Sequence, residues 1–163
     1  MKTRIISAFP ACGKSYIFQN QEELNITCSD SDSSHFSWVK DSKGNNTTIR
    51  NPDFPQNYIE HIKSLLGDVD YIFVSSHLEV RNALDDNELT YSLVLPSKEL
   101  KHEWLGRCWI RGNKDSFLNL INDNWDNWVN PAFSFCCISQ VRLGSGEFLK
   151  DKLYFLETTI SSN

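Results

Sequence analysis

Residues 8–15 read Ala-Phe-Pro-Ala-Cys-Gly-Lys-Ser and come directly after the apolar segment Arg4–Ala8, which predicts a first β-strand. The segment that starts at Ser15 predicts the opening of a helix. A tight loop between a strand and a helix start turns backbone N–H groups and the positive helix end toward one point, which favours phosphate. The pattern is typical of a phosphate-binding P-loop, with Ala8 in place of the usual first glycine. The expected ligand is therefore a nucleoside triphosphate with Mg²⁺.

The spacing predicts a role for individual residues of this loop. Lys14 is expected to contact the β- and γ-phosphates of ATP, and the hydroxyl of Ser15 is expected to ligate Mg²⁺. Pro10 has no N–H group, so it shapes the loop without binding phosphate. The expected ATP-binding residues are Ala11, Cys12, Gly13, Lys14, Ser15 and Tyr16.

Length and charge narrow the class of protein. A chain of 163 residues can bury a full core, and we expect a single domain over residues 1–163. The formal net charge of −5 disfavours nonspecific binding to DNA or RNA, which requires a broad basic face. Five cysteines without paired metal-ligand spacing predict reduced, packed thiols. The sequence has neither a signal-peptide pattern nor an apolar run of membrane-spanning length, which predicts a cytoplasmic protein without membrane contact.

Short apolar segments alternate with helical patterns along the chain. The expected strands cover residues 3–8, 24–28, 71–75, 91–95 and 135–141, and the expected helices lie near residues 13–22, 55–66, 79–84, 97–110 and 114–129. The polar stretch 40–53 reads as a mobile loop. This alternation predicts the α/β class, as a three-layer P-loop NTPase fold with a mostly parallel central sheet and helices on both faces.

Two carboxylates, Asp30 and Asp32, follow the second expected strand. Ligands of parallel sheets bind outside the carboxyl ends of the strands, so both acids are expected on the same rim as the loop. Asp30 is assigned as a catalytic residue, like Lys14, and with Ser15 as a metal ligand, whereas Asp32 is assigned to the acceptor. The alternative is that serine and aspartate gather here because they cap helices and favour turns.

The expected strand 71–75 ends without the acidic residue that many P-loop proteins place there as a magnesium ligand. Two arrangements are then open: Ser75 and either Asp30 or Asp32 hold the water shell of the magnesium ion, or the metal is contacted mainly through Ser15. His77, just past the strand, is expected to contact a phosphate or the acceptor. A hydrogen-bonded structural histidine is the equally weighted alternative.

Arginines at two places are candidates for phosphate recognition, because a guanidinium binds phosphate in a bidentate manner. Arg81 lies one helical turn past His77 and is expected to bind the acceptor, with a surface ion pair to a neighbouring acid as the alternative. Residues 97–114 carry five basic against two acidic residues, within an acidic chain. Arg107 and Arg111, four residues apart on one expected helical face, are assigned as catalytic residues that neutralise charge on the moving group. A solvated basic face is the alternative.

Aromatic side chains flank the polar stretch that follows Asp32. Phe36, Trp38 and Tyr58 are placed where an acceptor base could stack, and Phe36 and Trp38 are assigned to the acceptor site. Packing in the core is the alternative for each of them.

The segments 8–15, Asp30-Ser31-Asp32 and the helix with Arg107 and Arg111 together resemble small P-loop nucleoside monophosphate kinases. The stretch Phe73-Val74-Ser75-Ser76-His77 with Arg81, and Arg111-Gly112-Asn113 with Asn124-Trp125, is similar to short adenylate-kinase-like or deoxynucleotide kinase proteins encoded by phages. By order of elements the resemblance covers most of residues 1–150, and it is specific at the P-loop.

Such kinases transfer the γ-phosphoryl group of ATP to a nucleoside monophosphate and cover the reacting phosphates with lid arginines. The resemblance implies that Lys14 and Ser15 serve ATP and Mg²⁺, that Arg107 and Arg111 belong to a helical lid-like segment at about 97–130, and that Arg81 binds the acceptor phosphate. It also implies the host cytoplasm as the location of a phage-encoded protein. Two family features are absent from the sequence: an Asp-Gly-x-Pro-Arg segment after the third strand, and zinc-binding lid cysteines.

The expected function is phosphoryl transfer from ATP, with Mg²⁺, to a nucleoside or deoxynucleoside monophosphate. One alternative is a kinase of a hydroxyl acceptor, either a nucleoside or a nucleic-acid end, with Asp30 or Asp32 as general base. A second alternative is a nucleotide-binding regulatory protein without turnover. The expected partners are small nucleotides, and a homodimer stays open because the C-terminal strand could pair within the sheet or with another subunit.

Overall fold

A computed structural model of the chain describes residues 2–160, with side chains up to Leu156. Its centre is a five-stranded sheet in the order β2-β5-β1-β6-β7, and every pairing is parallel. The strands are β1 (Arg4–Ala8), β2 (Cys28–Ser31), β5 (Tyr71–Ser75), β6 (Tyr91–Pro96) and β7 (Cys137–Leu143). All residues of β5 and β6 are buried, which explains their continuous apolar sequences. β7 pairs with β6 inside this sheet.

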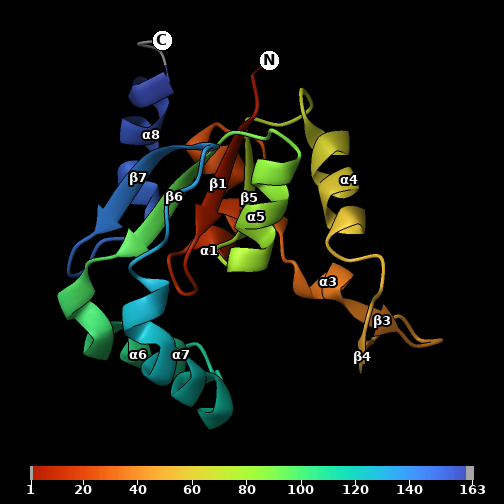
Figure 1. Cartoon of the computed structure of the whole chain (residues 1–163). Helices are drawn as coiled ribbons and strands as arrows, with labels where there is room; N and C mark the ends of the chain where they lie inside the picture. The colour runs from red at the N-terminus through yellow and green to blue at the C-terminus, as the bar shows by residue number, and fades with distance from the viewer. Residues whose placement is uncertain (1, 161–163) are drawn as a thin grey trace.

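Helices alternate with these strands, and several of them flank the sheet. The helices are α1 (Lys14–Gln19), α2 (Gln21–Leu24), α3 (Ser34–Ser37), α4 (Gln56–Leu65), α5 (Leu78–Asp86), α6 (Lys101–Ile110), α7 (Asp115–Trp128) and α8 (Leu153–Ile160). Figure 1 shows α4 and α5 side by side on the near face of the sheet, while α1 lies behind it. The expectation of an α/β fold with a parallel sheet between helices is confirmed. The ends of the expected domain, residues 1 and 161–163, lie outside the described residues.

The second strand lies later in the chain than expected. Residues 24–28 were predicted as a strand, but Leu24 ends α2 and Asn25 has a left-handed backbone with φ of 54°. The strand begins only at Cys28, after Thr27 has bonded to the Asp70 carboxylate through its N–H group. As a consequence, Asp30 belongs to β2 itself and Asp32 to the segment just beyond it.

The polar stretch 40–53, predicted as a loop, is largely an antiparallel hairpin of β3 (Trp38–Lys40) and β4 (Asn46–Arg50). Its turn is held by the Asp41 carboxylate, which accepts hydrogen bonds from the N–H groups of Lys43 and Asn45 at 2.9 Å each. Gly44 supplies the positive φ of 79° that the turn requires. Such a hairpin has little apolar alternation, because both of its faces are largely exposed.

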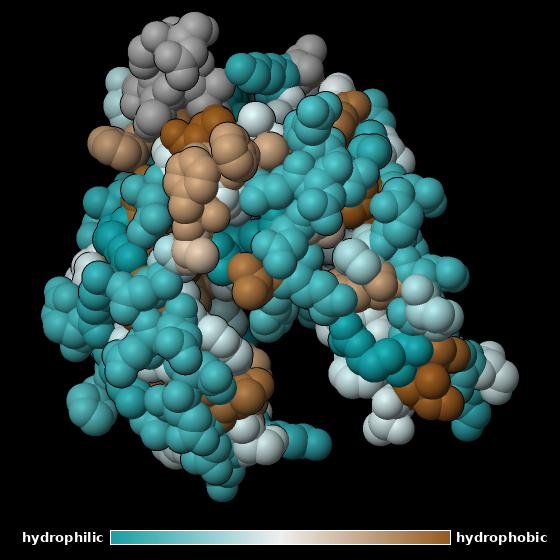
Figure 2. Space-filling model, viewed as in Figure 1, coloured by the Kyte–Doolittle hydropathy of each residue, from teal (hydrophilic) through white to brown (hydrophobic). Residues whose placement is uncertain are grey.

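Two arms extend from the carboxyl ends of the strands (Figure 1). The hairpin arm consists of α3, β3 and β4, and the helical arm consists of α6 and α7. The space-filling view shows a deep recess between them (Figure 2). Within residues 2–160, no helix is both long and apolar enough to cross a bilayer.

Asp85 holds the segment at Ser134 and Cys136, just before the last strand, through hydrogen bonds. The Asp85 carboxylate accepts hydrogen bonds from Ser134 Oγ at 2.6 Å and from the N–H group of Cys136 at 3.1 Å. Tyr91 donates its hydroxyl to Ser134 Oγ at 2.8 Å. This anchoring explains why β7 begins at Cys137, two residues later than predicted from the apolar pattern.

Replacing Asp85 with alanine is expected to lower the free energy of unfolding by about 2 kcal/mol, because hydrogen bonds to a charged group are lost and the Cys136 N–H is left unpaired. Urea denaturation followed by circular dichroism measures this change. Asp86→Ala on the same helix is the matched control, since Asp86 is exposed. Equal unfolding free energies of the two variants would contradict the anchoring role.

Candidate functional site

The β1–α1 loop folds back over the end of β1. Lys14 donates a hydrogen bond from Nζ to the carbonyl oxygen of Ala8 at 3.3 Å, so its side chain curls over the loop. Ala11 and Gly13 both have positive φ, 60° and 97°, which gives the loop its tight curvature. Burial lowers the pKa of Lys14, and the nearby Asp30 carboxylate counters part of this effect. A cation with its head group held over a concave backbone is suited to binding an anion.

Ser15 and Asp30 meet at this loop. Ser15 Oγ donates a hydrogen bond to Asp30 Oδ2 at 2.9 Å, across the space between α1 and β2. Among the described residues there is no group of three or more His, Cys, Asp or Glu side chains arranged as a metal site. Mg²⁺ ordinarily takes only one or two protein oxygens and completes its shell with water and substrate phosphates, so a hydroxyl beside a carboxylate fits this ion.

A cavity of about 620 Å³ opens beside Lys14 and Ser15, in the recess between the two arms (Figure 2). Three parts of the chain line it: the β1–α1 loop, the hairpin arm with the end of β2, and the start of α5 with the helical arm. Its charged lining residues are Lys14, Asp30, Asp32, Arg50, Glu79 and Arg111. The cavity therefore combines three cations and three carboxylates over the carboxyl end of the sheet.

Arg50 is the charged group of the hairpin arm in this cavity, and sequence reasoning missed it. Its guanidinium carbon lies 5.2 Å from the ring centroid of Trp38 and 5.3 Å from that of Phe54. Its Nη2 atom also pairs with Glu79 Oε2 at 3.0 Å, and both side chains are half exposed. The guanidinium is thus held at the cavity wall by two aromatic rings, as an exposed cation whose ion pair can exchange.

Three residues predicted for the acceptor side line the cavity: Asp32, Trp38 and His77. Asp32 accepts a hydrogen bond through Oδ1 from the N–H group of Ser34 at 2.9 Å. Burial lowers the pKa of His77 and the charge of Lys14 lowers it further, whereas Asp32 and Glu79 oppose this shift. The net shift favours the neutral imidazole at the cavity wall.

The other two predicted acceptor residues lie elsewhere. Arg81 is buried on α5, donates from Nε to the carbonyl oxygen of Ser76 at 3.0 Å, and is not part of the described cavity lining. Phe36 packs against Tyr58 and His61, with ring centroids 5.2 and 4.8 Å apart, and is also outside that lining.

The two arginines of the helical arm have different side-chain partners, although the N–H group of Arg111 bonds to the Arg107 carbonyl at 3.1 Å and so keeps the helical spacing. α6 ends at Ile110, and Arg111 follows as its last-turn cap, before Gly112 with φ of 89°. Arg111 lines the cavity and donates from Nε to Asn113 Oδ1 at 2.5 Å. Arg107 is not part of the described cavity lining, and its guanidinium bonds to the Ala11 carbonyl of the β1–α1 loop.

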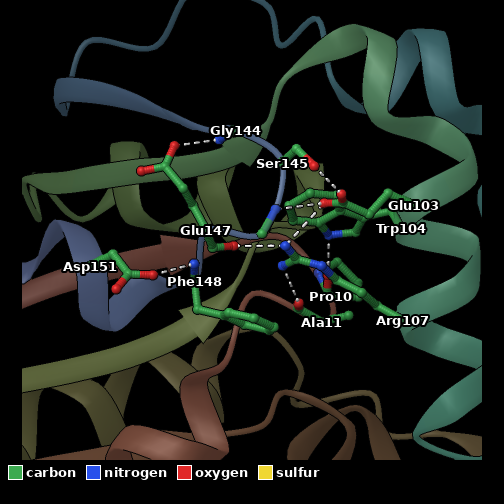
Figure 3. Close-up of polar contacts among 11 residues, drawn as sticks. Pro10, Ala11, Glu103, Trp104, Arg107, Gly144, Ser145, Glu147, Phe148 and Asp151 are labelled. Atoms are coloured by element: carbon green, nitrogen blue, oxygen red, sulfur yellow. Dashed lines mark hydrogen bonds and ion pairs between the residues drawn. The ribbon is translucent and has the colours of Figure 1, made fainter.

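Arg107 is the centre of a network drawn in Figure 3. Its guanidinium lies between two rings, 3.8 Å from the centroid of Trp104 and 4.1 Å from that of Phe148. It donates hydrogen bonds to Glu147 O at 2.8 Å, to Glu103 Oε2 at 3.1 Å and to Ala11 O at 3.4 Å. In this conformation Arg107 holds the loop and the segment after β7 together, and it is only 11% exposed.

The remaining loop residues surround this network. Cys12 is buried, and burial raises the pKa of its thiol to about 12. Its carbonyl oxygen accepts a hydrogen bond from the N–H group of Leu149 at 2.8 Å. Gly13 lies against Phe148, since an added Cβ would sit 3.3 Å from the ring. Tyr16 is half exposed, with Lys150 Nζ 4.9 Å from its ring centroid.

No protein-family model matches the chain, and no curated protein matches it. Among solved structures, the chain is similar to an uncharacterized protein from Eubacterium ventriosum ATCC 27560. The two chains are 15% identical, the match covers 98% of this chain and 99% of the other, and the TM-score is 0.48.

Proposed function

We propose that this protein is a phosphotransferase that moves the γ-phosphoryl group of ATP, with Mg²⁺, to a nucleoside or deoxynucleoside monophosphate. The observation that carries the proposal is that Lys14, the Ser15–Asp30 pair and two arginines, Arg50 and Arg111, line one cavity. These are the groups that bind phosphate and a hard cation, placed at the carboxyl end of a parallel sheet.

The donor end of the site is the β1–α1 loop, interpreted as a P-loop. The loop and Lys14 would bind the β- and γ-phosphates, and Ser15 with Asp30 would hold the metal ion. Bound Mg²⁺ would neutralise charge on the phosphate oxygens. Lys14 is well suited to this position because it is already oriented over the loop by the Ala8 carbonyl.

The acceptor end is the hairpin arm. A phosphate acceptor is already an anion, so it requires positioning and charge neutralisation more than a general base. Arg50 provides an exposed guanidinium for bidentate phosphate binding, and Arg111 enters from the opposite arm. The rings of Trp38 and Phe54 provide apolar surface on which a base can stack.

A hydroxyl acceptor is the second candidate, and Asp32 favours it. Its carboxylate lines the same cavity, and a carboxylate there would accept the proton of an attacking hydroxyl. The two candidates differ in what Asp32 does, because a monophosphate acceptor has no comparable need for a base.

ADP formation from ATP and Mg²⁺ tests the proposal with matched pairs of acceptors, each nucleoside beside its own 5′-monophosphate in the ribo and deoxyribo series. The proposal predicts turnover with one or more monophosphates and none with their nucleosides. Turnover restricted to nucleosides would favour the hydroxyl acceptor instead. ATP binding without turnover on either series would favour a regulatory nucleotide-binding protein.

Arg50→Gln is expected to raise the KM of the acceptor by about tenfold to a hundredfold, with a smaller effect on kcat, because charge-assisted hydrogen bonds to the acceptor phosphate are lost. Steady-state kinetics at saturating ATP measure both parameters. Lys43→Gln, in the turn of the same hairpin, removes one positive charge at an exposed position and serves as the control. An unchanged KM for Arg50→Gln would remove Arg50 from the acceptor site.

A further inference from the structure

The segment after β7 packs on the β1–α1 loop at Cys12 and Gly13, and it is not part of the described cavity lining. Residues 144–148, here called the strap, connect β7 to the 3₁₀ turn Leu149–Lys152. Ser145 Oγ donates a hydrogen bond to Glu103 Oε1 at 2.6 Å, and Arg107 donates to Glu147 O. Figure 3 shows the Glu103 carboxylate and the main-chain oxygen of Glu147 turned toward Arg107, with the ring of Phe148 below its guanidinium.

The direction of phosphoryl transfer indicates what this side of the loop faces. In an in-line displacement, the attacking and leaving oxygens lie on opposite sides of the moving phosphorus atom. If the acceptor binds at the hairpin-arm side of the cavity, the ADP part of the donor must lie on the opposite side of the γ-phosphorus atom. It then extends over the β1–α1 loop toward α6 and the strap. The nucleoside of the donor is then directed to the neighbourhood of Arg107 and Phe148.

A guanidinium sandwiched between two rings is a stacking site for a planar base, because bases stack on arginine as aromatic rings do. The two rings differ in mobility. Trp104 is fully buried and donates from Nε1 to Pro10 O at 3.0 Å, so it is fixed. Phe148 is 38% exposed and belongs to a strap with glycines at positions 144 and 146, of which Gly146 has φ of 72°. The Phe148 face of Arg107 is therefore the one that can be vacated.

We infer that Phe148 competes with the donor nucleotide: its ring occupies the face of Arg107 on which the donor base stacks, and ATP binding displaces it together with the strap. This inference rests on the proposed function, since it needs the triphosphate on the β1–α1 loop. The closed strap then lowers the apparent affinity for ATP, because part of the binding free energy opens it. Inorganic tripolyphosphate has no base and leaves the strap closed.

Calorimetric titration with ATP and with inorganic tripolyphosphate, both with Mg²⁺, tests this competition in the wild type and in two variants. Phe148→Leu removes the flat ring while keeping apolar bulk, and Phe148→Ala removes both. Each variant is expected to bind ATP ~3–10-fold more tightly, the size of one aromatic contact, with unchanged affinity for tripolyphosphate. Phe135→Ala, an exposed phenylalanine remote from Arg107, should change neither affinity.

Two other results have distinct meanings. Unchanged or weaker ATP binding in both Phe148 variants, while the wild type binds tripolyphosphate, would overturn the competition and leave the proposed function standing. Failure of the wild type to bind either ligand would overturn the proposed function, and the competition with it.

Discussion

Lys14→Ala is expected to reduce kcat for phosphoryl transfer by about a thousandfold, the loss that follows removal of a group that stabilises transition-state charge. In the structure Lys14 is held over the β1–α1 loop by the Ala8 carbonyl, and both Lys14 and Asp30 line the cavity. Alanine removes the positive charge over the loop. The other two cations of the cavity lining, Arg50 and Arg111, cannot take its place because they lie on the two arms rather than on the loop. A coupled assay of ADP formation measures the change.

The control for this substitution is Lys63→Ala, an exposed lysine on α4. It removes the same charge from the chain and should leave kcat unchanged, and circular dichroism should show that both variants are folded. A Lys14→Ala variant that keeps more than about a tenth of wild-type kcat would contradict the assignment of the loop as the donor phosphate site.

Asp30→Asn is expected to lower kcat by about a hundredfold and to raise the Mg²⁺ concentration needed for half-maximal rate, because a neutral amide is a poor ligand for a hard cation. The amide oxygen can still accept the hydrogen bond from Ser15 Oγ, so the local geometry is largely preserved. Titrating the rate with Mg²⁺ at fixed ATP separates the loss of metal affinity from a loss of structure.

Asp32→Asn is the informative partner of this variant. It makes the same change two residues away, in a side chain that lines the same cavity. With a monophosphate acceptor, Asp32→Asn should retain most of the activity, whereas a hydroxyl acceptor would lose its base. Equal Mg²⁺ dependence of Asp30→Asn and the wild type would argue against a metal site at Ser15 and Asp30.

The parts of the fold that sequence predicted best are those determined by local, continuous patterns. The run Tyr71–Ser75 is a buried central strand, as expected from its apolar sequence. Ser15 and Asp30 were expected to meet because loops at the carboxyl ends of neighbouring parallel strands share one rim, and they are 2.9 Å apart. The hairpin arm was missed, because its strands are mostly exposed and held by a turn rather than by an apolar face.

Side-chain direction was less predictable than position. The spacing of Arg107 and Arg111 predicted one shared helical face but not their different partners: Phe148, 41 residues later in the chain, packs on Arg107, whereas Arg111 lines the cavity. Arg81 was expected to reach the rim, but it is buried and bonds to the Ser76 carbonyl. The sequence pattern around Arg50, a polar stretch, did not predict a functional role for it, because its position at the cavity depends on packing against Trp38 and Phe54. Each orientation depends on tertiary packing, and for Arg107 the partner Phe148 lies far along the chain.

Phosphorus NMR of the wild-type protein with ATP, Mg²⁺ and a mixture of ribo- and deoxyribonucleoside monophosphates tests the central claim most directly, because it identifies the bond that forms. The account predicts that the γ-phosphate signal of ATP decreases while new diphosphate signals from an acceptor appear, and that Lys14→Ala abolishes both changes. If ATP stays intact, or if its γ-phosphate appears only as inorganic phosphate, the assignment of this cavity to a monophosphate acceptor is wrong.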